Sequence, residues 1–265
     1  MHVRLTIGHT SVWGRDNEAA FLFVSGMAID ADGAPTAYHG APDQSLGLDN
    51  LANAGHPGNW WGIVTDDGTA KGNPVVQGDG DPAPGFYVSS TSLADPSVDR
   101  TDPLRYVDST SIPFIVLPRQ AVITLGARLG DFALVRDLKT GFTSAAVFAD
   151  GGPAGKLGEG SIALADAIGI PSSPRTGGTS SRHIAYLVFA GSRGGFPQSS
   201  DDLSSNVDET FSTWGGETRL QKWIAAATAT PANQHHPVQF DLRAQPADIR
   251  TGPSPRPTME QLTVD

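Results

Sequence analysis

The apolar segments of this chain are short, and turn-forming residues bound most of them. Glycine and proline supply 31 and 20 of the 265 residues, and both interrupt long regular elements. Short runs rich in β-branched and aromatic residues between such turns are typical of strands. The pattern predicts strands at residues 2–7, 21–29, 59–66, 86–93, 105–108, 112–117, 121–125, 132–135, 145–149 and 183–190.

Helical spacing is convincing in two places only. Residues 161–168 begin at Ser161, a good N-cap, and stop at Gly169. Residues 217–228 have one apolar face. The sequence therefore predicts a mainly β (β-rich α+β) fold, which is a compact barrel-like domain with few helices.

A change in composition after Gly191 predicts the domain organisation. Residues 1–190 are enough to bury one substantial core and are read as a single domain. Residues 191–265 are read as a C-terminal extension that contains the helix at 217–228. The rest of it is expected to be partly irregular, because prolines are frequent from residue 231 onward.

The chain carries a formal net charge of −10. This argues against nucleic acid as a partner, because phosphate binding draws on clustered Lys and Arg, and it favours a cationic substrate. Cysteine is absent, which excludes disulfides and zinc–thiolate sites. We expect no membrane association, because no apolar run is long enough to cross a bilayer. Residues 1–8 lack the pattern of a secretion signal.

Motifs for cofactors and metals fit poorly. Residues 158–163 match the dinucleotide pattern G-x-G-x-x-A formally, but the chain lacks alternating βαβ units. The segment Asp30-Ala31-Asp32-Gly33 begins like a calcium loop, yet the closing Glu is missing, so turn chemistry is the better interpretation. His235 and His236 are expected to be solvated. We therefore expect no metal and no cofactor.

Residues 144–164 hold two carboxylates that are nine positions apart. Asp150 follows the predicted strand at 145–149, and Glu159 stands between two glycines. Glycine and proline in the connection let the chain fold back. A folded loop could bring the carboxyl groups to the roughly 6.5–9.5 Å that an inverting glycosidase needs. An acid after a strand is also a common turn former or helix cap, so both interpretations stay open.

Trp60 and Trp61 are adjacent in a predicted strand, so their side chains are expected on opposite faces. One of them can face the core while the other faces solvent or a sugar ring. A core or inter-sheet role for both is equally compatible with the sequence.

Six blocks between residues 25 and 190 carry a resemblance to a known family. They read MAIDADGAPTAYHG, GLDNLANAGHPGNWWGIVTD, DPAPGFYVSSTSL, IPFIVLP, LGDFALV and FADGGPAGKLGEGSIALA. Together they are similar to the fungal-type chitosanases of glycoside hydrolase family 75. The resemblance implies a secreted, endo-acting, inverting hydrolase of the β-1,4 glucosaminidic bonds of chitosan, with its functional carboxylates at Asp150 and Glu159. Analogy with other inverting endo-glycosidases favours a double-psi barrel.

Roles for individual residues follow from that resemblance. Glu159, beside apolar Leu157 and Ile162, is the expected general acid and Asp150 the expected general base, with Asp131 as the second candidate for the base. Lys156 either holds a carboxylate in place or is solvated. The full set of predicted substrate contacts is Asp30, Asp66, Tyr87, Thr91, Asp131 and Lys156, and structural roles are the alternative for Asp30, Asp66, Tyr87 and Thr91.

Two other functions remain compatible with these residues. One is a non-catalytic protein that binds chitosan or another polysaccharide. The other is a hydrolase of a different amino-sugar polymer. The expected partners are chitosan and glucosamine oligosaccharides, and the chain is expected to be a monomer.

Overall fold

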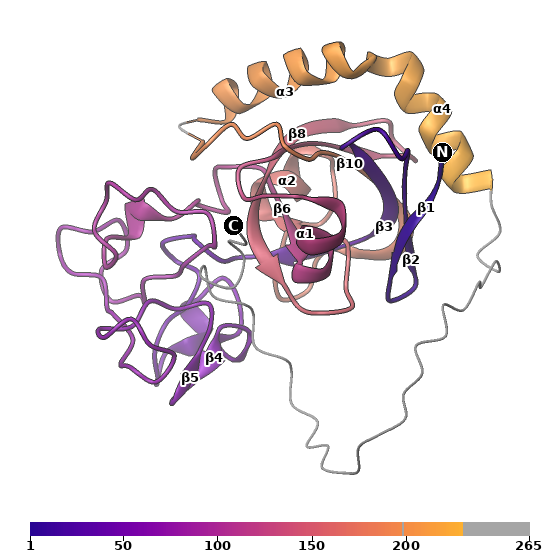
Figure 1. The fold of residues 1–265 in the computed structure, drawn as a ribbon. Coiled ribbons are helices and arrows are strands. Elements are labelled where there is room, and N and C mark those ends of the chain that lie inside the picture. Colours follow the sequence, from indigo (N-terminus) through magenta and orange to yellow (C-terminus); the bar gives the residue numbers. More distant parts are fainter. Residues whose placement is uncertain (198, 230–265) are drawn as a thin grey trace, which may run out of the picture.

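A computed structural model describes residues 1–197 and 199–229 (Figure 1). The tail predicted to be irregular from residue 231, with His235 and His236, lies outside the described residues. The described chain has three parts: a central β-barrel, a lobe formed by residues 31–113, which we call the loop lobe, and two C-terminal helices.

Six strands form the closed barrel: β3 (Phe21–Asp30), β6 (Phe114–Pro118), β7 (Phe132–Asp137), β8 (Thr143–Gly152), β9 (Glu159–Ser161) and β10 (Thr179–Phe189). Their order around the ring is β3, β10, β7, β8, β6 and β9, and the pairing of β9 with β3 closes it. The pairs β3–β9 and β6–β8 are parallel. The predicted β-rich, barrel-like fold is confirmed, and the double-psi form stays a prediction.

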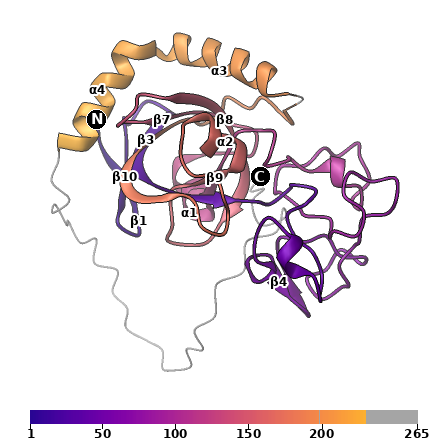
Figure 2. The same cartoon turned by 180° about the vertical axis from the view of Figure 1, so that it is seen from behind.

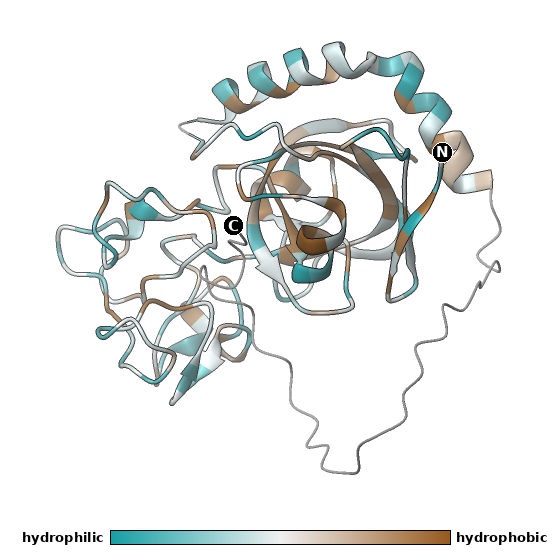
Figure 3. Ribbon diagram, viewed as in Figure 1, coloured by the Kyte–Doolittle hydropathy of each residue, from teal (hydrophilic) through white to brown (hydrophobic). Residues whose placement is uncertain are grey.

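A hairpin of β1 (His2–Ile7) and β2 (Thr10–Gly14) continues the sheet beyond β3. Two short helices, α1 (Arg119–Leu125) and α2 (Ile162–Ala167), pack against the apolar cluster that the barrel encloses. In that cluster the rings of Phe23 and Tyr186 stack with centroids 4.6 Å apart. The hydrophobic residues drawn in brown in Figure 3 concentrate on the barrel strands and α1, whereas the loop lobe is mixed.

A second apolar cluster lies on the outer face of the barrel. The helices α3 (Ser200–Trp214) and α4 (Gly216–Ala229) cover it with Leu203, Val207 and Trp223, among other residues. Figures 1 and 2 show both helices along one side of the barrel, while the loop lobe occupies another side. Within the described residues, no helix has the length and the apolar character needed to span a membrane.

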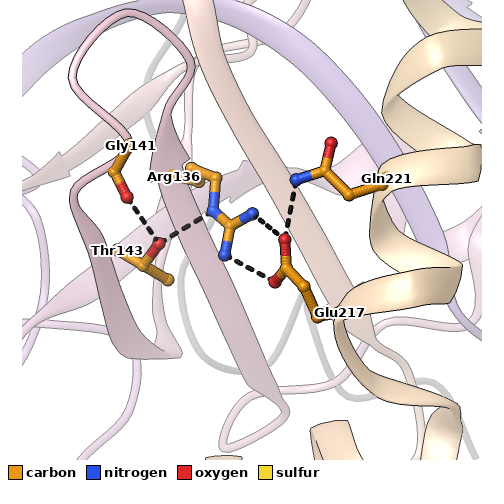
Figure 4. Close-up of polar contacts among 5 residues, drawn as sticks. All are labelled: Arg136, Gly141, Thr143, Glu217 and Gln221. Atoms are coloured by element: carbon orange, nitrogen blue, oxygen red, sulfur yellow. Dashed lines mark hydrogen bonds and ion pairs between the residues drawn. The ribbon is translucent and has the colours of Figure 1, made fainter.

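An ion pair fastens α4 to the barrel (Figure 4). The guanidinium of Arg136 on β7 donates to both carboxylate oxygens of Glu217, at 2.6 and 2.8 Å, and its Nε donates to Thr143. Gln221 donates to the same carboxylate at 2.7 Å. These hydrogen bonds, Arg136 first, lower the pKa of Glu217 to about 2.

Local prediction succeeded for some helices and failed for others. The Ser161 hydroxyl accepts from the backbone N–H of Leu164 and caps α2, and α4 matches the predicted amphipathic helix. Residues 121–125, predicted as a strand, belong to α1, because a short apolar run looks the same in either state. Helix α3 was not predicted, because only two of its residues, Leu203 and Val207, are buried and its apolar pattern is weak.

The loop lobe has little regular structure. Its elements are β4 (Gly55–His56), β5 (Asn59–Trp60) and single 3-10 turns at Gln44–Leu46, Leu51–Asn53 and Pro103–Arg105. Of the predicted strand at 59–66, only Asn59 and Trp60 belong to a paired strand, β5. The remainder, and the predicted strand at 86–93, form isolated bridges, such as those of Ser89 with Ile63 and of Tyr87 with Val76. Alternating burial alone does not make a strand when no neighbour offers a continuous ladder of hydrogen bonds.

Candidate active site

Asp150 lies within strand β8, which continues to Gly152 and does not end at residue 149. The register between β6 and β8 shifts, so that Phe148 pairs with Ile115 but Asp150 pairs with Val116. Ile115 and Phe148 belong to the enclosed cluster, whereas Val116 belongs to the outer one. The irregularity therefore turns Asp150 toward the outer face, on the side of the loop lobe. β-bulges commonly re-aim a side chain in this way.

Glu159 is the first residue of β9, which pairs in parallel with the end of β3. The preceding residue, Gly158, has φ +92, and a Cβ there would lie 2.5 Å from the Gly26 carbonyl oxygen. Only glycine fits this turn without strain. The carbonyl of Gly158 also accepts a hydrogen bond from the Ala28 N–H at 2.9 Å. The glycine-rich connection thus folds back, as predicted, and delivers Glu159 to a strand and not to a loop.

A cleft of about 370 Å³ lies where the loop lobe meets the barrel. From the barrel side it is lined by Glu159 and Asp30 together with the connecting loops. From the lobe side it is lined by Asp49, Asn53 and Trp61, among others. Both carboxylates of the barrel side are buried, with exposed fractions of 8% for Glu159 and 2% for Asp30.

Lys156 also lines the cleft, and its Nζ lies 3.6 Å from Oε2 of Glu159. Of the two roles that the sequence left open for Lys156, the structure shows the pairing with a carboxylate. The buried hydroxyl of Tyr186 is a further neighbour: burial raises its pKa, and the charge of Glu159 raises it further. Three acidic residues and one lysine line the cleft, so its charge favours a cationic ligand.

Asp30 is the last residue of β3 and stands beside Glu159. In the β3–β9 register, Ala28 pairs with Glu159 and Asp30 pairs with Ser161. Glu159 and Asp30 are therefore two positions apart on neighbouring strands and on the same face of the sheet. The sequence placed Asp30 among possible substrate contacts, and its position in the cleft agrees with that role.

Asp150 is close to Asp30 but is not among the residues that line the cleft. Its Oδ1 accepts two hydrogen bonds from Ser92, from the backbone N–H at 2.8 Å and from the hydroxyl at 2.7 Å. One carboxylate oxygen from each of Asp30, Asp32 and Asp150 lies within 4.8 Å of the others. Asp150 of the sequence-based pair thus belongs to a group of three buried aspartates.

Local hydrogen bonds order this group of acids. Oδ1 of Asp30 accepts from the Asp32 N–H at 2.9 Å, and Oδ1 of Asp32 accepts from the Tyr38 hydroxyl at 2.6 Å. Carboxylate oxygens are ligands for hard cations such as Ca²⁺. Each of the three carboxylates accepts a hydrogen bond from the protein, which fixes its orientation.

The two tryptophans have different surroundings, which is one of the two interpretations that the sequence left open, although strand β5 ends at Trp60. Trp60 is buried in the lobe's apolar cluster with Tyr38, whereas Trp61 lines the cleft. The indole N–H of Trp61 donates to the Asn53 carbonyl at 2.8 Å, which fixes the ring at the cleft wall. A fixed aromatic face beside carboxylates is a suitable surface for a sugar ring.

Arg175 connects the loop lobe to the barrel. Its guanidinium donates to the side-chain oxygen of Asn50 and to the carbonyls of Gln44, Gly47 and Asp49, over distances of 2.8–3.1 Å. Its neighbour in the chain, Pro174, lines the cleft, as does Asp49. This arginine therefore holds the two walls of the cleft together.

Four predicted substrate contacts lie outside the cleft lining, and their side chains have structural partners. Asp131, also the second candidate for the base, is fully buried and accepts from the N–H groups of residues 128, 191 and 193. The Thr91 hydroxyl donates to Leu93 and accepts from Val107. Hydrogen bonds from Asn73 lower the pKa of Asp66 at an exposed turn. The Tyr87 ring is tilted against that of Trp60.

No family model matches this chain, and the comparison with curated proteins gives no match.

Proposed function

We propose that this chain is an endo-acting, inverting glycoside hydrolase that cleaves the β-1,4 glucosaminidic bonds of chitosan. The observation that carries the proposal is that Glu159 and Asp30, one of a group of three buried aspartates, line the same acidic cleft, whose wall also includes the half-buried Trp61. Two carboxyl groups on opposite sides of a glycosidic bond are what hydrolysis with inversion requires. The order of the sequence blocks similar to family 75 supports the same reaction and substrate.

The chemistry assigns one role to each of two carboxyl groups. Glu159, protonated, donates its proton to the departing glycosidic oxygen as the bond from C1 breaks. A carboxylate of the aspartate group removes a proton from water, which attacks C1 from the opposite face and inverts its configuration. The sequence resemblance favours Asp150 as that carboxylate. Trp61 offers its face to a sugar ring, and Asp49 adds negative charge for the protonated amines.

The variant Glu159→Gln tests the proposal, because it keeps the shape and removes the ionisable group. We expect reducing sugar release from chitosan to fall by roughly 10²–10⁴-fold. Asp166→Asn, an exposed acid on α2, is the matched control and is expected to keep full activity. NMR of the first product is expected to show the α anomer, and chitosan binding is expected to weaken with added salt.

Other outcomes separate the alternatives. Near wild-type release of oligomers by the Glu159 variant would remove this residue from the mechanism. Binding of chitosan with no rise in reducing ends in the wild type would identify a non-catalytic binding protein. Faster cleavage of highly acetylated polymers than of chitosan would identify a hydrolase for another amino-sugar polymer.

A further inference from the structure

We infer that Ser92, a residue of the loop lobe, is a positioning residue for Asp150 on the barrel. The inference rests on the proposed function, in which Asp150 is the carboxylate favoured as the general base. Ser92 does not contact the reacting atoms in this role and acts through the orientation of the Asp150 side chain. The lobe would then contribute to the catalytic step as well as to the wall of the cleft.

The segment that carries Ser92 lies along strand β8. Strand β7 pairs with β8 as far as Val147. Beyond that residue, the Leu93 N–H from the lobe donates to the Ala149 carbonyl at 2.7 Å. Ser92 therefore meets β8 at the next residue, Asp150, where the ladder between β7 and β8 has ended.

Ser92 makes three hydrogen bonds to this part of β8. Oδ1 of Asp150 accepts from the Ser92 N–H at 2.8 Å and from its hydroxyl at 2.7 Å. The hydroxyl oxygen itself accepts from the Gly151 N–H at 3.1 Å. Because the Gly151 N–H occupies a lone pair of the hydroxyl, the hydroxyl proton is directed to Oδ1. Hydrogen bonds to an ionised carboxylate are stronger than those between neutral groups, and two donors on one oxygen fix the rotation of the carboxyl group.

The neighbouring acids make the orientation of Asp150 depend on such donors. One carboxylate oxygen from each of Asp30, Asp32 and Asp150 lies within 4.8 Å of the others, and ionised carboxylates at this distance repel one another. Asp30 accepts from the Asp32 N–H, and Asp32 accepts from the Tyr38 hydroxyl. Ser92 supplies the corresponding donors to Asp150. Without its hydroxyl we expect the Asp150 carboxyl group to rotate, which displaces the oxygen that removes the proton from water.

The lobe also fixes the segment from its own side. The hydroxyl of Thr91 donates to the Leu93 carbonyl at 2.7 Å and accepts from the Val107 N–H at 3.0 Å. These bonds do not involve the Ser92 side chain. Truncation of that side chain is therefore expected to leave the path of residues 91–93 unchanged.

The variant Ser92→Ala tests the inference, because it removes the hydroxyl and keeps the backbone N–H that donates to Asp150. We expect kcat on chitosan to fall roughly 10–100-fold, since a small displacement of a catalytic group has an effect of this size. KM is expected to stay nearly unchanged, because Ser92 lies outside the residues that line the cleft. Ser92→Thr keeps a hydroxyl and is expected to recover most of the lost kcat. Ser92→Cys offers a weaker donor and should lie between the two.

Ser89→Ala is the matched control. Ser89 is a buried serine of the same lobe, and its hydroxyl accepts from the Gly33 N–H at 3.0 Å and donates to the Gly62 carbonyl at 3.1 Å. Both partners are backbone groups, so its loss is expected to lower stability and to leave kcat near the wild-type value. Urea unfolding of each variant, measured beside its kinetics, separates a loss of stability from a loss of positioning.

The remaining outcomes count against the inference. Wild-type kcat in Ser92→Ala, equal falls of kcat in Ser89→Ala and Ser92→Ala, or failure of both Ser92→Thr and Ser92→Cys to recover kcat would overturn it and leave a chitosanase. A higher KM at constant kcat would place Ser92 in substrate binding and would also overturn it. Absence of any cleavage by the wild type would instead overturn the proposed function, and the role of Ser92 with it.

Discussion

The barrel and the loop lobe are built on different principles. The barrel is a closed ladder of strands with apolar clusters on both faces of its wall. The lobe has one two-residue hairpin and isolated bridges, with only small apolar clusters. Side chains that bind backbone carbonyls hold it in place, as Arg100 does with Thr65 and Asp66. A closed barrel can hold buried acids in place while a loop-built lobe supplies the other wall of the cleft.

The largest expected change in the free energy of unfolding comes from a substitution in the barrel core. Phe148 is fully buried in the enclosed cluster, so Phe148→Ala is expected to lower the free energy of unfolding by about 3–5 kcal/mol. Urea unfolding followed by tryptophan fluorescence measures it. Phe142→Ala is the matched control, because that ring is 58% exposed, and a change within about 0.5 kcal/mol is expected. Equal losses for the two variants would contradict the burial of Phe148 as the source of the stability.

A smaller loss of stability, confined to the loop lobe, is expected from a substitution where the lobe meets the barrel. Arg175→Ala removes four hydrogen bonds to the lobe, and because the side chain is exposed we expect a loss of about 1–2 kcal/mol. Hydrogen exchange is expected to rise in residues 44–50 and to stay unchanged in the barrel strands. Arg175→Lys keeps the charge but not the forked donors, so we expect it to recover little of the lost stability. Uniformly faster exchange in the barrel and the lobe would show that the two parts are not separable.

If the lobe supplies the binding surface, a substitution in its cleft wall should weaken the binding of oligosaccharides. Trp61→Ala is expected to weaken oligosaccharide binding by about 1 kcal/mol, or about fivefold, because the stacking face is lost. Steady-state kinetics on chitosan are expected to show a higher KM with kcat nearly unchanged. Trp61→Phe keeps an aromatic ring and should lie between the two. A fall in kcat at constant KM would place the ring in the chemistry and not in binding.

The smallest change in stability is expected from the ion pair between Glu217 on α4 and Arg136 on the barrel. The pKa of Glu217 is lowered to about 2 from an ordinary value of 4.5, so its contribution to stability is complete above about pH 4.5 and disappears as pH falls through about 2. The side chain is 53% exposed, so water screens the pair and we expect no more than about 1 kcal/mol. Urea unfolding of the wild type and Glu217→Gln should differ at pH 6 and converge toward pH 2. A difference in unfolding free energy that grows as the pH falls would contradict the lowered pKa of Glu217.

The candidate site was predictable in part, and particular residues show which features could not be predicted from the sequence. Glu159 and the glycines before it indicated a chain that folds back, since Gly158 occupies a conformation that other residues avoid. Asp131 was the second candidate for the base, because nothing local shows that the N–H groups of residues 128, 191 and 193 enclose its carboxylate. The grouping of Asp30 with Asp150 across 120 positions of chain has no local signal either.

The sequence by itself determined the short apolar runs, the caps of α2 and the turns, because each depends on neighbours within a few residues. Tertiary structure alone decided which strands became neighbours, that the register shift turned Asp150 outward, and that Asp30 stands beside Glu159. The physical reason is that side-chain direction alternates along a strand, so a one-residue change of register moves a carboxylate from one face of the barrel wall to the other.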